Sequence, residues 1–432
     1  MATGKWIEHW EPENPEFWAK TGKKVATRNL IFSIFAEHLG FSVWLLWSVV
    51  VVSLPKAGFT FTVDQLFWLV AVPNLVGSTL RLPYTFAVPK FGGRNWTVFS
   101  ALALLLPTGL LAWAVSDPTT PFWVFLIVAA TAGVGGGNFA SSMTNINFFY
   151  PEKQKGFALG LNAAGGNLGV AVVQLGIPLV ISIGTGIHLA YAGLVWAPFI
   201  ILAAACAFFF MDNLKAAKSD FGAQIASTKR SQTWVMSFLY IGTFGSFIGY
   251  SAALPLLIKT QFPSISVADF AFLGALVGSV ARPAGGWLAD RFGGAKVTLF
   301  SFLVMGIGAF AVLEGVAAKS FPLFLGAFML LFIASGAGNG STYRMIPAIF
   351  AAQGNPKAEA GAAIGIASAI GAFGGFFVPR FLGMSLASTH SVASAFYGFV
   401  GFYAICLAVT WWCYLRSRVL VSVAPSLAPA AV

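Results

Sequence analysis

The amino-acid sequence predicts an all-α membrane protein with 12 transmembrane helices, arranged as two pseudo-symmetric six-helix bundles. Three observations predict this fold class: an excess of apolar residues, twelve separate apolar stretches and an internal repeat. Of the 432 residues, 58% are hydrophobic and only 9% are charged, whereas about a quarter of the residues in a soluble domain are charged. A soluble core cannot bury so much apolar surface, so lipid must be the solvent for much of it.

Twelve stretches reach the length of about 20 apolar residues that a membrane-spanning helix needs. They lie at 29–54, 64–89, 96–115, 121–149, 156–183, 188–211, 232–258, 267–289, 297–317, 321–350, 361–385 and 393–415. They predict an N-terminal bundle at 29–211 and a C-terminal bundle at 232–415, joined by a linker at 212–231 with the polarity of a loop. Residues 1–28 form an N-terminal segment, either solvated or held at the membrane interface by its tryptophans, and 416–432 a tail.

The basic residues predict the orientation of the chain in the membrane. If the N-terminus lies inside, eighteen Lys and Arg residues fall in cytoplasmic segments and three fall in outer loops, Lys56, Lys259 and Lys319. Such a bias is the positive-inside pattern of multi-pass proteins. We therefore expect a multi-pass protein of the cytoplasmic (inner) membrane with both termini cytoplasmic. The net charge of +11 then reflects topology, and no nucleic-acid partner is expected.

The two predicted bundles repeat one another at an offset of about 201 residues. VGSTLRLPYTFAVPKFGG at 76–93 aligns with VGSVARPAGGWLADRFGG at 277–294, and GGGNFASS at 135–142 aligns with GAGNGSTY at 336–343. At an offset of 205, GFALGLNAAGGNLG aligns with GAAIGIASAIGAFGG, so that Gly166 matches Gly371 and Gly169 matches Gly374. Two six-helix halves in parallel repeat are the plan of a secondary transporter whose site lies between the halves.

The repeat places one arginine at the same depth in each half. Arg81 and Arg282 each lie nine residues before a basic residue at the cytoplasmic edge, which is about 13 Å along a helix and close to the midplane of the bilayer. One of them could form a structural ion pair with Glu37 or Glu314. Two buried cations with so few carboxylates are better explained by a site for a small oxyanion, which a guanidinium can hold with two parallel hydrogen bonds.

The other polar residues carry weaker signals. Arg344 and Arg380 lie near helix ends and are expected to be interface anchors. The three cysteines and four histidines show no metal-ligand spacing, and no nucleophile–base pair indicates catalysis, so neither a metal nor an enzyme activity is expected. Glu37 and His38 are adjacent in the first helix and could bind a coupling proton. Alternatively, Glu37 pairs with an arginine or His38 faces polar backbone.

Several stretches resemble the nitrate/nitrite porters of the major facilitator superfamily over nearly the whole chain. They are AGVGGGNFASSMTNINFFYP at 132–151, KGFALGLNAAGGNLGVAVVQL at 155–175 and GIASAIGAFGGFFVP at 365–379. GGWLADRFGGAK also resembles the superfamily's loop signature between the eighth and ninth helices, whereas the first-half counterpart PKFGGRN lacks the acidic residue. The glycines in these stretches that resemble the family's nitrate signatures are Gly165, Gly166, Gly169, Gly371, Gly374 and Gly375.

The resemblance implies a fold, a set of ligands and a mechanism. It implies that nitrate and nitrite bind to Arg81, Arg282, Phe139, Phe244, Tyr240 and Asn167. If two fixed cations form the site, a carrier without a bound anion should resist the change of conformation. This favours exchange of nitrate for nitrite by alternating access. Proton-coupled nitrate symport and transport of another small anion stay open. We expect a monomer in the lipid bilayer without a cofactor.

Overall fold

The computed structural model describes residues 6–217 and 221–416. Among these residues, 12 helical segments are long and apolar enough to cross a membrane. The prediction of an all-α chain with twelve membrane-spanning helices is therefore confirmed. The chain forms two compact units, one of residues 1–60 and 72–219 and the other of residues 61–71 and 220–432. The expected tail at 416–432 lies outside the described residues except for Arg416.

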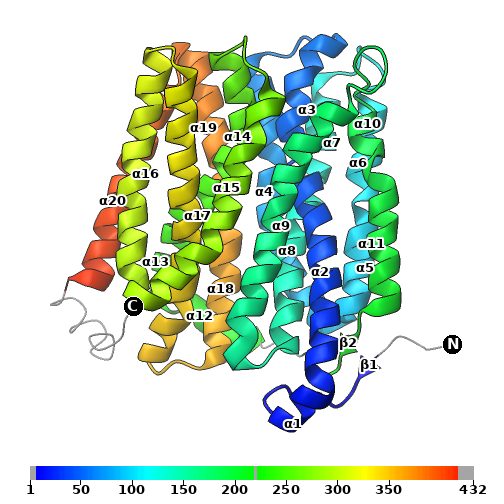
Figure 1. Cartoon of the computed structure of the whole chain (residues 1–432), viewed down its shortest axis with the longest axis vertical. Coiled ribbons are helices and arrows are strands. Elements are labelled where there is room, and N and C mark those ends of the chain that lie inside the picture. The colour runs from blue at the N-terminus through cyan, green and yellow to red at the C-terminus, as the bar shows by residue number, and fades with distance from the viewer. Residues whose placement is uncertain (1–5, 218–220, 417–432) are drawn as a thin grey trace. The chain divides into compact units, whose positions relative to one another are not determined.

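The first unit contains the first six spans and two short strands (Figure 1). Its elements, with η denoting a π- or 3₁₀-helix, are β1 Trp6–Ile7, α1 Pro15–Phe17, η1 Trp18–Gly22, α2 Lys23–Trp44, α3 Trp47–Ser53, η2 Leu54–Ala57, α4 Val63–Phe91, α5 Gly93–Ala103, α6 Leu105–Ala114, α7 Phe122–Thr131, α8 Gly133–Phe149, α9 Glu152–Val180, α10 Tyr191–Leu194, α11 Trp196–Phe210 and β2 Asn213–Leu214. Helix α2 packs against both α8 and α9. The first nine residues of α4 belong to the second unit.

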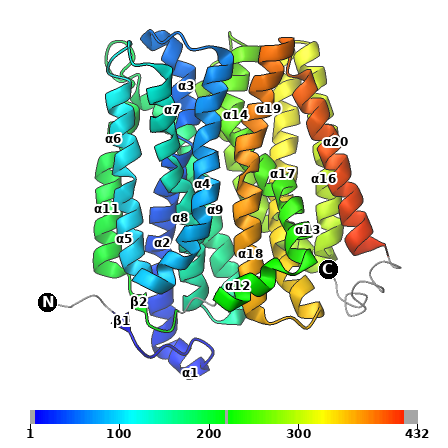
Figure 2. The same ribbon diagram turned by 180° about the vertical axis from the view of Figure 1, so that it is seen from behind.

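The second unit contains the last six spans (Figure 2). Its elements are α12 Phe221–Thr228, α13 Ser231–Tyr240, η3 Ile241–Gly245, α14 Ser246–Gln261, α15 Val267–Phe292, α16 Gly294–Ala317, α17 Phe321–Ala352, α18 Lys357–Ala372, α19 Gly374–Thr389, α20 Ala393–Thr410 and η4 Trp411–Leu415. Helix α17 packs against α15 and α16, and α13 packs against α18.

The repeated Phe-Gly-Gly sequence ends the arginine-bearing helix in the same way in both units. Helices α4 and α15 stop at Phe91 and Phe292, and the glycines that follow have φ of 88° at Gly92 and 93° at Gly293. Only glycine adopts such a backbone conformation without strain. The sequence repeat is therefore also a repeat of local structure, and it fixes where each arginine lies relative to the helix end.

The N-terminal segment is folded onto the first bundle. Trp10 and Trp18 are buried in an apolar cluster with Phe149, Tyr150 and Leu214, and β1 pairs with β2 in parallel. Because Lys215 donates a hydrogen bond to Glu8 and lies beside its carboxylate, the pKa of Glu8 is lowered. Trp10 and Trp18 thus pack against protein, whereas Trp6 is exposed.

The linker is not a plain loop, because α12 forms within it and packs against α18. The linker was expected to be irregular from its polarity, but Ala223 and Ser227 are buried on one face of this helix. Arg230 then joins the linker to α18, its Nε lying 2.8 Å from the Glu359 carboxylate. This hydrogen bond and the nearby negative charge raise the pKa of Arg230.

Candidate functional site: two buried arginines

Arg81 lies in the interior of the first unit and is fully buried. Its Nε donates a hydrogen bond to the carbonyl oxygen of Gly136 at 3.2 Å. The centre of its guanidinium lies 4.5 Å from the centroid of the Phe139 ring and 5.3 Å from that of Trp44. A cation over aromatic faces in a water-poor interior is stabilised by the ring quadrupoles. The first unit thus combines a fixed positive charge with the predicted aromatic residue Phe139.

Glycines in the first unit set how closely these groups approach one another. A Cβ atom at Gly77 would lie 2.5 Å from Nε1 of Trp44, and one at Gly137 would lie 2.8 Å from the Tyr84 ring. Because glycine leaves room at Gly77, the indole of Trp44 can donate a hydrogen bond to the Pro73 carbonyl at 2.9 Å. The ring is thereby held where it faces Arg81.

Arg282 occupies the matching position on α15 in the second unit and is 5% exposed. Its Nη2 lies 3.5 Å from the hydroxyl of Tyr240, and its guanidinium centre lies 5.6 Å from the centroid of the Tyr343 ring. Tyr240 also stacks on Phe244, with ring centroids 5.4 Å apart. The structure therefore brings together three of the predicted ligands, Arg282, Tyr240 and Phe244.

Asn167, the predicted amide ligand, lies on α9 and is 1% exposed. Neither its Nδ2 nor its Oδ1 has a hydrogen-bond partner within residues 6–217 and 221–416. Buried amides are normally hydrogen-bonded, so an unpartnered one needs an explanation such as a bound ligand or water.

The signature glycines lie where helices approach closely. A Cβ at Gly165 would lie 2.4 Å from Ile34, and one at Gly169 would lie 2.3 Å from the carbonyl oxygen of His38. In the second unit, a Cβ at Gly374 would lie 2.3 Å from the Gly245 backbone, and Gly375 is buried beside it. Gly165, Gly169 and Gly374 thus leave no room for a larger residue and allow the helices to pack closely.

Two signature glycines touch polar residues named from the sequence. A Cβ at Gly166 would lie 2.5 Å from Oε1 of Glu37, and a Cβ at Gly371 would lie 2.4 Å from Cδ1 of Tyr240. The matched glycines of the repeat therefore make room for Glu37 in the first unit and for Tyr240 in the second.

Glu37 and His38 point to different partners. Glu37 accepts hydrogen bonds from the Ser142 hydroxyl and, at 2.6 Å, from Nδ2 of Asn162. His38 Nδ1 lies 3.0 Å from the carbonyl oxygen of Gly165. Adjacent residues on a helix do not face one another, so Glu37 and His38 do not act as a pair. The His38 side chain faces polar backbone, which is one of the alternatives stated from the sequence.

The two arginines near helix ends are paired with carboxylates. The Nη1 of Arg380 lies 2.9 Å from the Asp64 carboxylate, and its guanidinium centre is 4.0 Å from the Trp68 ring centroid. The Arg380 side chain is only 10% exposed, because the carboxylate and the indole replace the water that an interface anchor would reach. Its partner Asp64 was missed from the sequence, since 316 residues separate the two.

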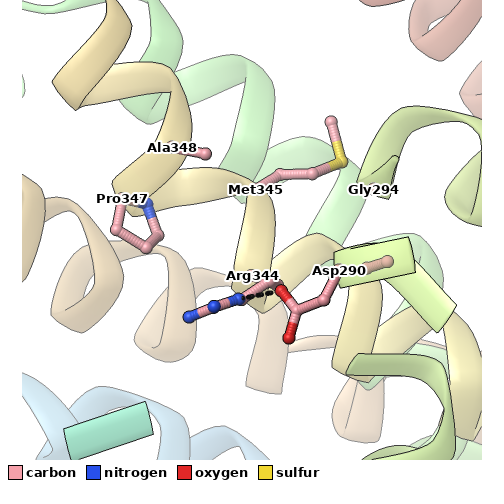
Figure 3. A pocket seen from close by; sticks show the side chains of 7 residues that line it. Asp290, Gly294, Arg344, Met345, Pro347 and Ala348 are labelled. Atoms are coloured by element: carbon pink, nitrogen blue, oxygen red, sulfur yellow. Dashed lines mark hydrogen bonds and ion pairs between the residues drawn. The ribbon is translucent and has the colours of Figure 1, made fainter. Parts of the chain in front are cut away.

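Arg344 pairs with Asp290 of the loop signature at the end of α15, with Nε 2.5 Å from the carboxylate oxygen (Figure 3). The pair lines a pocket of about 310 Å³ together with Met345 and Pro347. Both side chains are more than half exposed. A solvated arginine already matched by a carboxylate is a poor anion site, so this pocket is not the candidate site despite its size.

Sequence reasoning also missed Tyr343 and Trp44, whose rings lie near the two guanidinium groups. Tyr343 follows Asn339 by one helical turn in the repeated GAGNGSTY, and that repeat was the available signal. The π-helical turn η3, which carries Phe244, has no sequence signature, although such turns are frequent at functional sites. Within the described ranges, no group of three His, Cys, Asp or Glu side chains could hold a metal.

This arrangement of buried arginines in a twofold-repeated helical chain defines a secondary-transporter fold, and comparison with known proteins identifies its family. The family model of the Major Facilitator Superfamily matches residues 38–261 and 236–429. A D-xylose-proton symporter superposes with a TM-score of 0.67, at 18% identity, over 88% of this chain and 97% of that chain. A bacterial homologue of the lysosomal transporter Spinster, in an inward-facing and occupied conformation, superposes with a TM-score of 0.66, at 17% identity, over 91% of this chain and 97% of its own. The chain belongs to the major facilitator superfamily.

Closer relatives place the chain within one branch of that superfamily. The nitrate/nitrite transporter NarU of Salmonella typhimurium is 44% identical over 95% of this chain and 96% of its own, and that of Escherichia coli is 42% identical over the same shares. The probable nitrate/nitrite antiporter NarK2 of Thermus thermophilus is 38% identical over 96% of this chain and 98% of its own. The chain is a multi-pass membrane protein of the family formed by these transporters, and the resemblance seen in the sequence is confirmed.

Proposed function

We propose that this protein is a secondary active transporter that moves nitrate and nitrite across the cytoplasmic membrane by alternating access. The observation that carries the proposal is the pair of repeat-related arginines, Arg81 and Arg282, each buried among aromatic rings. The names of the relatives at 38–44% identity support the choice of anion.

The chemistry of the two groups suits a small planar anion. Nitrate has three acceptor oxygens in one plane, which a guanidinium fork can address from the edge. A ring such as Phe139 in the first unit or Phe244 in the second can cover a face of the anion, and the amide of Asn167 offers a further donor in the first unit. Arg380 and Arg344 are each already paired with a carboxylate, which makes them poorer anion sites.

Exchange of nitrate for nitrite follows from the fixed charges. When no anion is bound and no other group compensates its charge, two cations in a low-dielectric interior lack part of their stabilisation, and the change of conformation becomes costly. Return of the carrier is then easiest with a second anion in the site. The positive-inside bias supports cytoplasmic termini, and the protein acts as a monomer in the bilayer.

Proton-coupled nitrate uptake is the second candidate, and the hydrogen-bonded carboxylate of Glu37 inside the first unit favours it. A buried carboxylate that can gain and lose a proton would change the charge near Arg81 without a second anion. Transport of another small anion would use the same arginines and is distinguished by competition.

The test is anion exchange in liposomes that contain the purified protein. Arg81→Lys and Arg282→Lys keep the charge but remove the planar fork, so we expect each to lower nitrate/nitrite exchange by at least about 100-fold. Arg344→Lys is the matched control, since its partner Asp290 is at the solvated end of α15. Normal exchange by either site variant would refute the anion site, and formate or cyanate outcompeting nitrate would refute the substrate.

A further inference from the structure

A buried polar cluster surrounds Glu37 inside the first unit. Glu37 is 1% exposed, and one of its carboxylate oxygens, Oε2, accepts hydrogen bonds from both Ser142 and Asn162. The Ser142 hydroxyl in turn lies 2.5 Å from Nδ2 of Asn162 and 2.9 Å from the Ser33 hydroxyl. A charged carboxylate this deep in a membrane protein is costly and usually serves a function.

The cluster borders a small polar cavity of about 10 Å³, which is about the space that one water molecule needs. Its walls are formed by α2, α5 and α8 and include Ser33, Thr97, Ser100 and Asn138. Asn138 is 3% exposed, and neither of its amide atoms has a hydrogen-bond partner among the residues that the structure describes. An amide with both atoms unpartnered in a polar cavity indicates a small ligand that both donates and accepts hydrogen bonds.

The repeat allows the surroundings of Glu37 to be compared with those of Tyr240. Gly166 of the first unit contacts Glu37, and Gly371, which matches it in the repeat, contacts Tyr240 of the second unit. Tyr240 is the residue whose hydroxyl lies 3.5 Å from Arg282. Beside this pair of matched glycines, the first unit has a carboxylate and the second unit has a phenol close to its arginine.

Charged and titratable groups on the helices around Glu37 have partners of their own. Arg81 on α4 binds Gly136, six residues and about 9 Å along α8 from Ser142. Arg94 on α5 donates to the Phe208 carbonyl at 2.7 Å and so faces α11. His38 faces Gly165 of α9. The sequences of α8 and α11 contain no charged residue, and the charges of α9 lie in its first turn. Arg28 on α2 pairs with Asp212. Arg81 is therefore taken as the cation whose charge Glu37 balances.

We infer that Glu37, with the hydroxyls and amides around it, is a proton-binding site. It gives the transporter, besides exchange, a second way to return its anion site to the other face of the membrane. The carboxylate takes up one proton and becomes a neutral carboxylic acid when nitrate binds at the arginines, and it releases that proton when nitrate leaves. The nitrate's negative charge then replaces the carboxylate's, so the net charge inside the membrane is the same in the loaded and the empty carrier. The carrier can therefore return empty, or return with nitrite where nitrite is present.

This inference rests on the proposed transport of nitrate, and its test separates the two. Proteoliposomes without internal anion are given nitrate and an inward proton gradient, and a trapped pH dye reports proton entry. The wild-type protein should take up nitrate together with protons. Glu37→Gln should reduce this uptake at least tenfold more than it reduces nitrate/nitrite exchange. Glu314→Gln is the matched control, because Glu314 is exposed on α16, and it should change neither.

Two results would overturn the inference, and a third would count against the proposed function. Proton entry with nitrate that persists in Glu37→Gln excludes this site, and wild-type exchange without any proton-driven uptake excludes the second return route while leaving the proposed function intact. Absence of exchange by the wild-type protein counts against the proposed function itself.

If Glu37→Gln loses both activities, infrared spectroscopy of the purified full-length protein decides. The spectrum should contain a protonated-carboxylic-acid band that titrates with pH. Loss of this band in Glu37→Gln, with the band kept in Glu314→Gln, supports the site. A band that Glu37→Gln leaves unchanged rejects it. Ser142→Ala removes one donor to Glu37 and should shift the pH profile of coupled uptake; an unchanged profile counts against the site.

Discussion

The two units hold equivalent arginines in different chemical surroundings. In the first unit, Arg81 lies against Phe139 and Trp44, with the carboxylate of Glu37 about two turns away along the neighbouring helix. In the second unit, Arg282 lies against two tyrosines, Tyr240 and Tyr343. Matching backbones therefore present an acid in one half and phenols in the other.

This difference assigns separate tasks to the two halves of a duplicated fold. A phenol close to a guanidinium can donate a hydrogen bond to an anion without neutralising the cation. A carboxylate can balance the cation when the anion is absent, but it must not occupy the anion's place.

Placing an acid at the phenol position gives the largest expected effect. The Tyr240 hydroxyl lies 3.5 Å from Arg282. Tyr240→Glu would put a carboxylate near that position, where it would pair with the guanidinium and compete with nitrate. We expect the apparent affinity for nitrate in the exchange assay to fall by about 10- to 100-fold, the value of a charge-assisted hydrogen bond. The change is measured as the KM for external nitrate.

Tyr240→Phe is the matched control for that substitution. It removes only the hydroxyl and should raise the KM by about two- to tenfold. If Tyr240→Glu binds nitrate no more weakly than Tyr240→Phe, Arg282 is not an anion ligand. The proposed difference in function between the units would then be wrong.

The glycines that accommodate Glu37 and Tyr240 give an effect of intermediate size. Gly166→Ala and Gly371→Ala would each place a Cβ within 2.5 Å of a buried side chain, and overpacking of this kind costs about 1–3 kcal/mol. We expect a lower thermal unfolding midpoint for both. Gly160→Ala and Gly361→Ala are the controls on the same helices, because a Cβ at either would meet nothing within 4 Å. Equal midpoints for all four variants would contradict the packing role.

The arginines could be predicted because they are repeated in sequence, whereas their surroundings could not. Arg81 and Arg282 match within similar segments at an offset of 201, and Gly166 and Gly371 match at an offset of 205. The correspondence of Glu37 with Tyr240 is invisible in an alignment, because the two residues share neither chemistry nor flanking sequence. Only the contact of each with its glycine reveals it. The partner of Arg380 was missed for a related reason, since a contact across 316 residues leaves no local pattern.

A further asymmetry between the units should have the smallest effect. Asp290 and Arg344 form an ion pair at the end of α15 in the second unit, and at the offset of 201 the first unit has Pro89 and Met143 in their places. Because both side chains are more than half exposed, Asp290→Asn should change the free energy of unfolding by less than about 1 kcal/mol. Asp64→Asn, which breaks the more deeply buried pair with Arg380, should cost about 2 kcal/mol or more. Thermal unfolding of the two variants measures this order. A larger loss of unfolding free energy in Asp290→Asn than in Asp64→Asn would mean that the loop signature stabilises the second unit through contacts beyond its exposed ion pair. The units would then differ in their stabilising contacts as well as in the groups around their arginines.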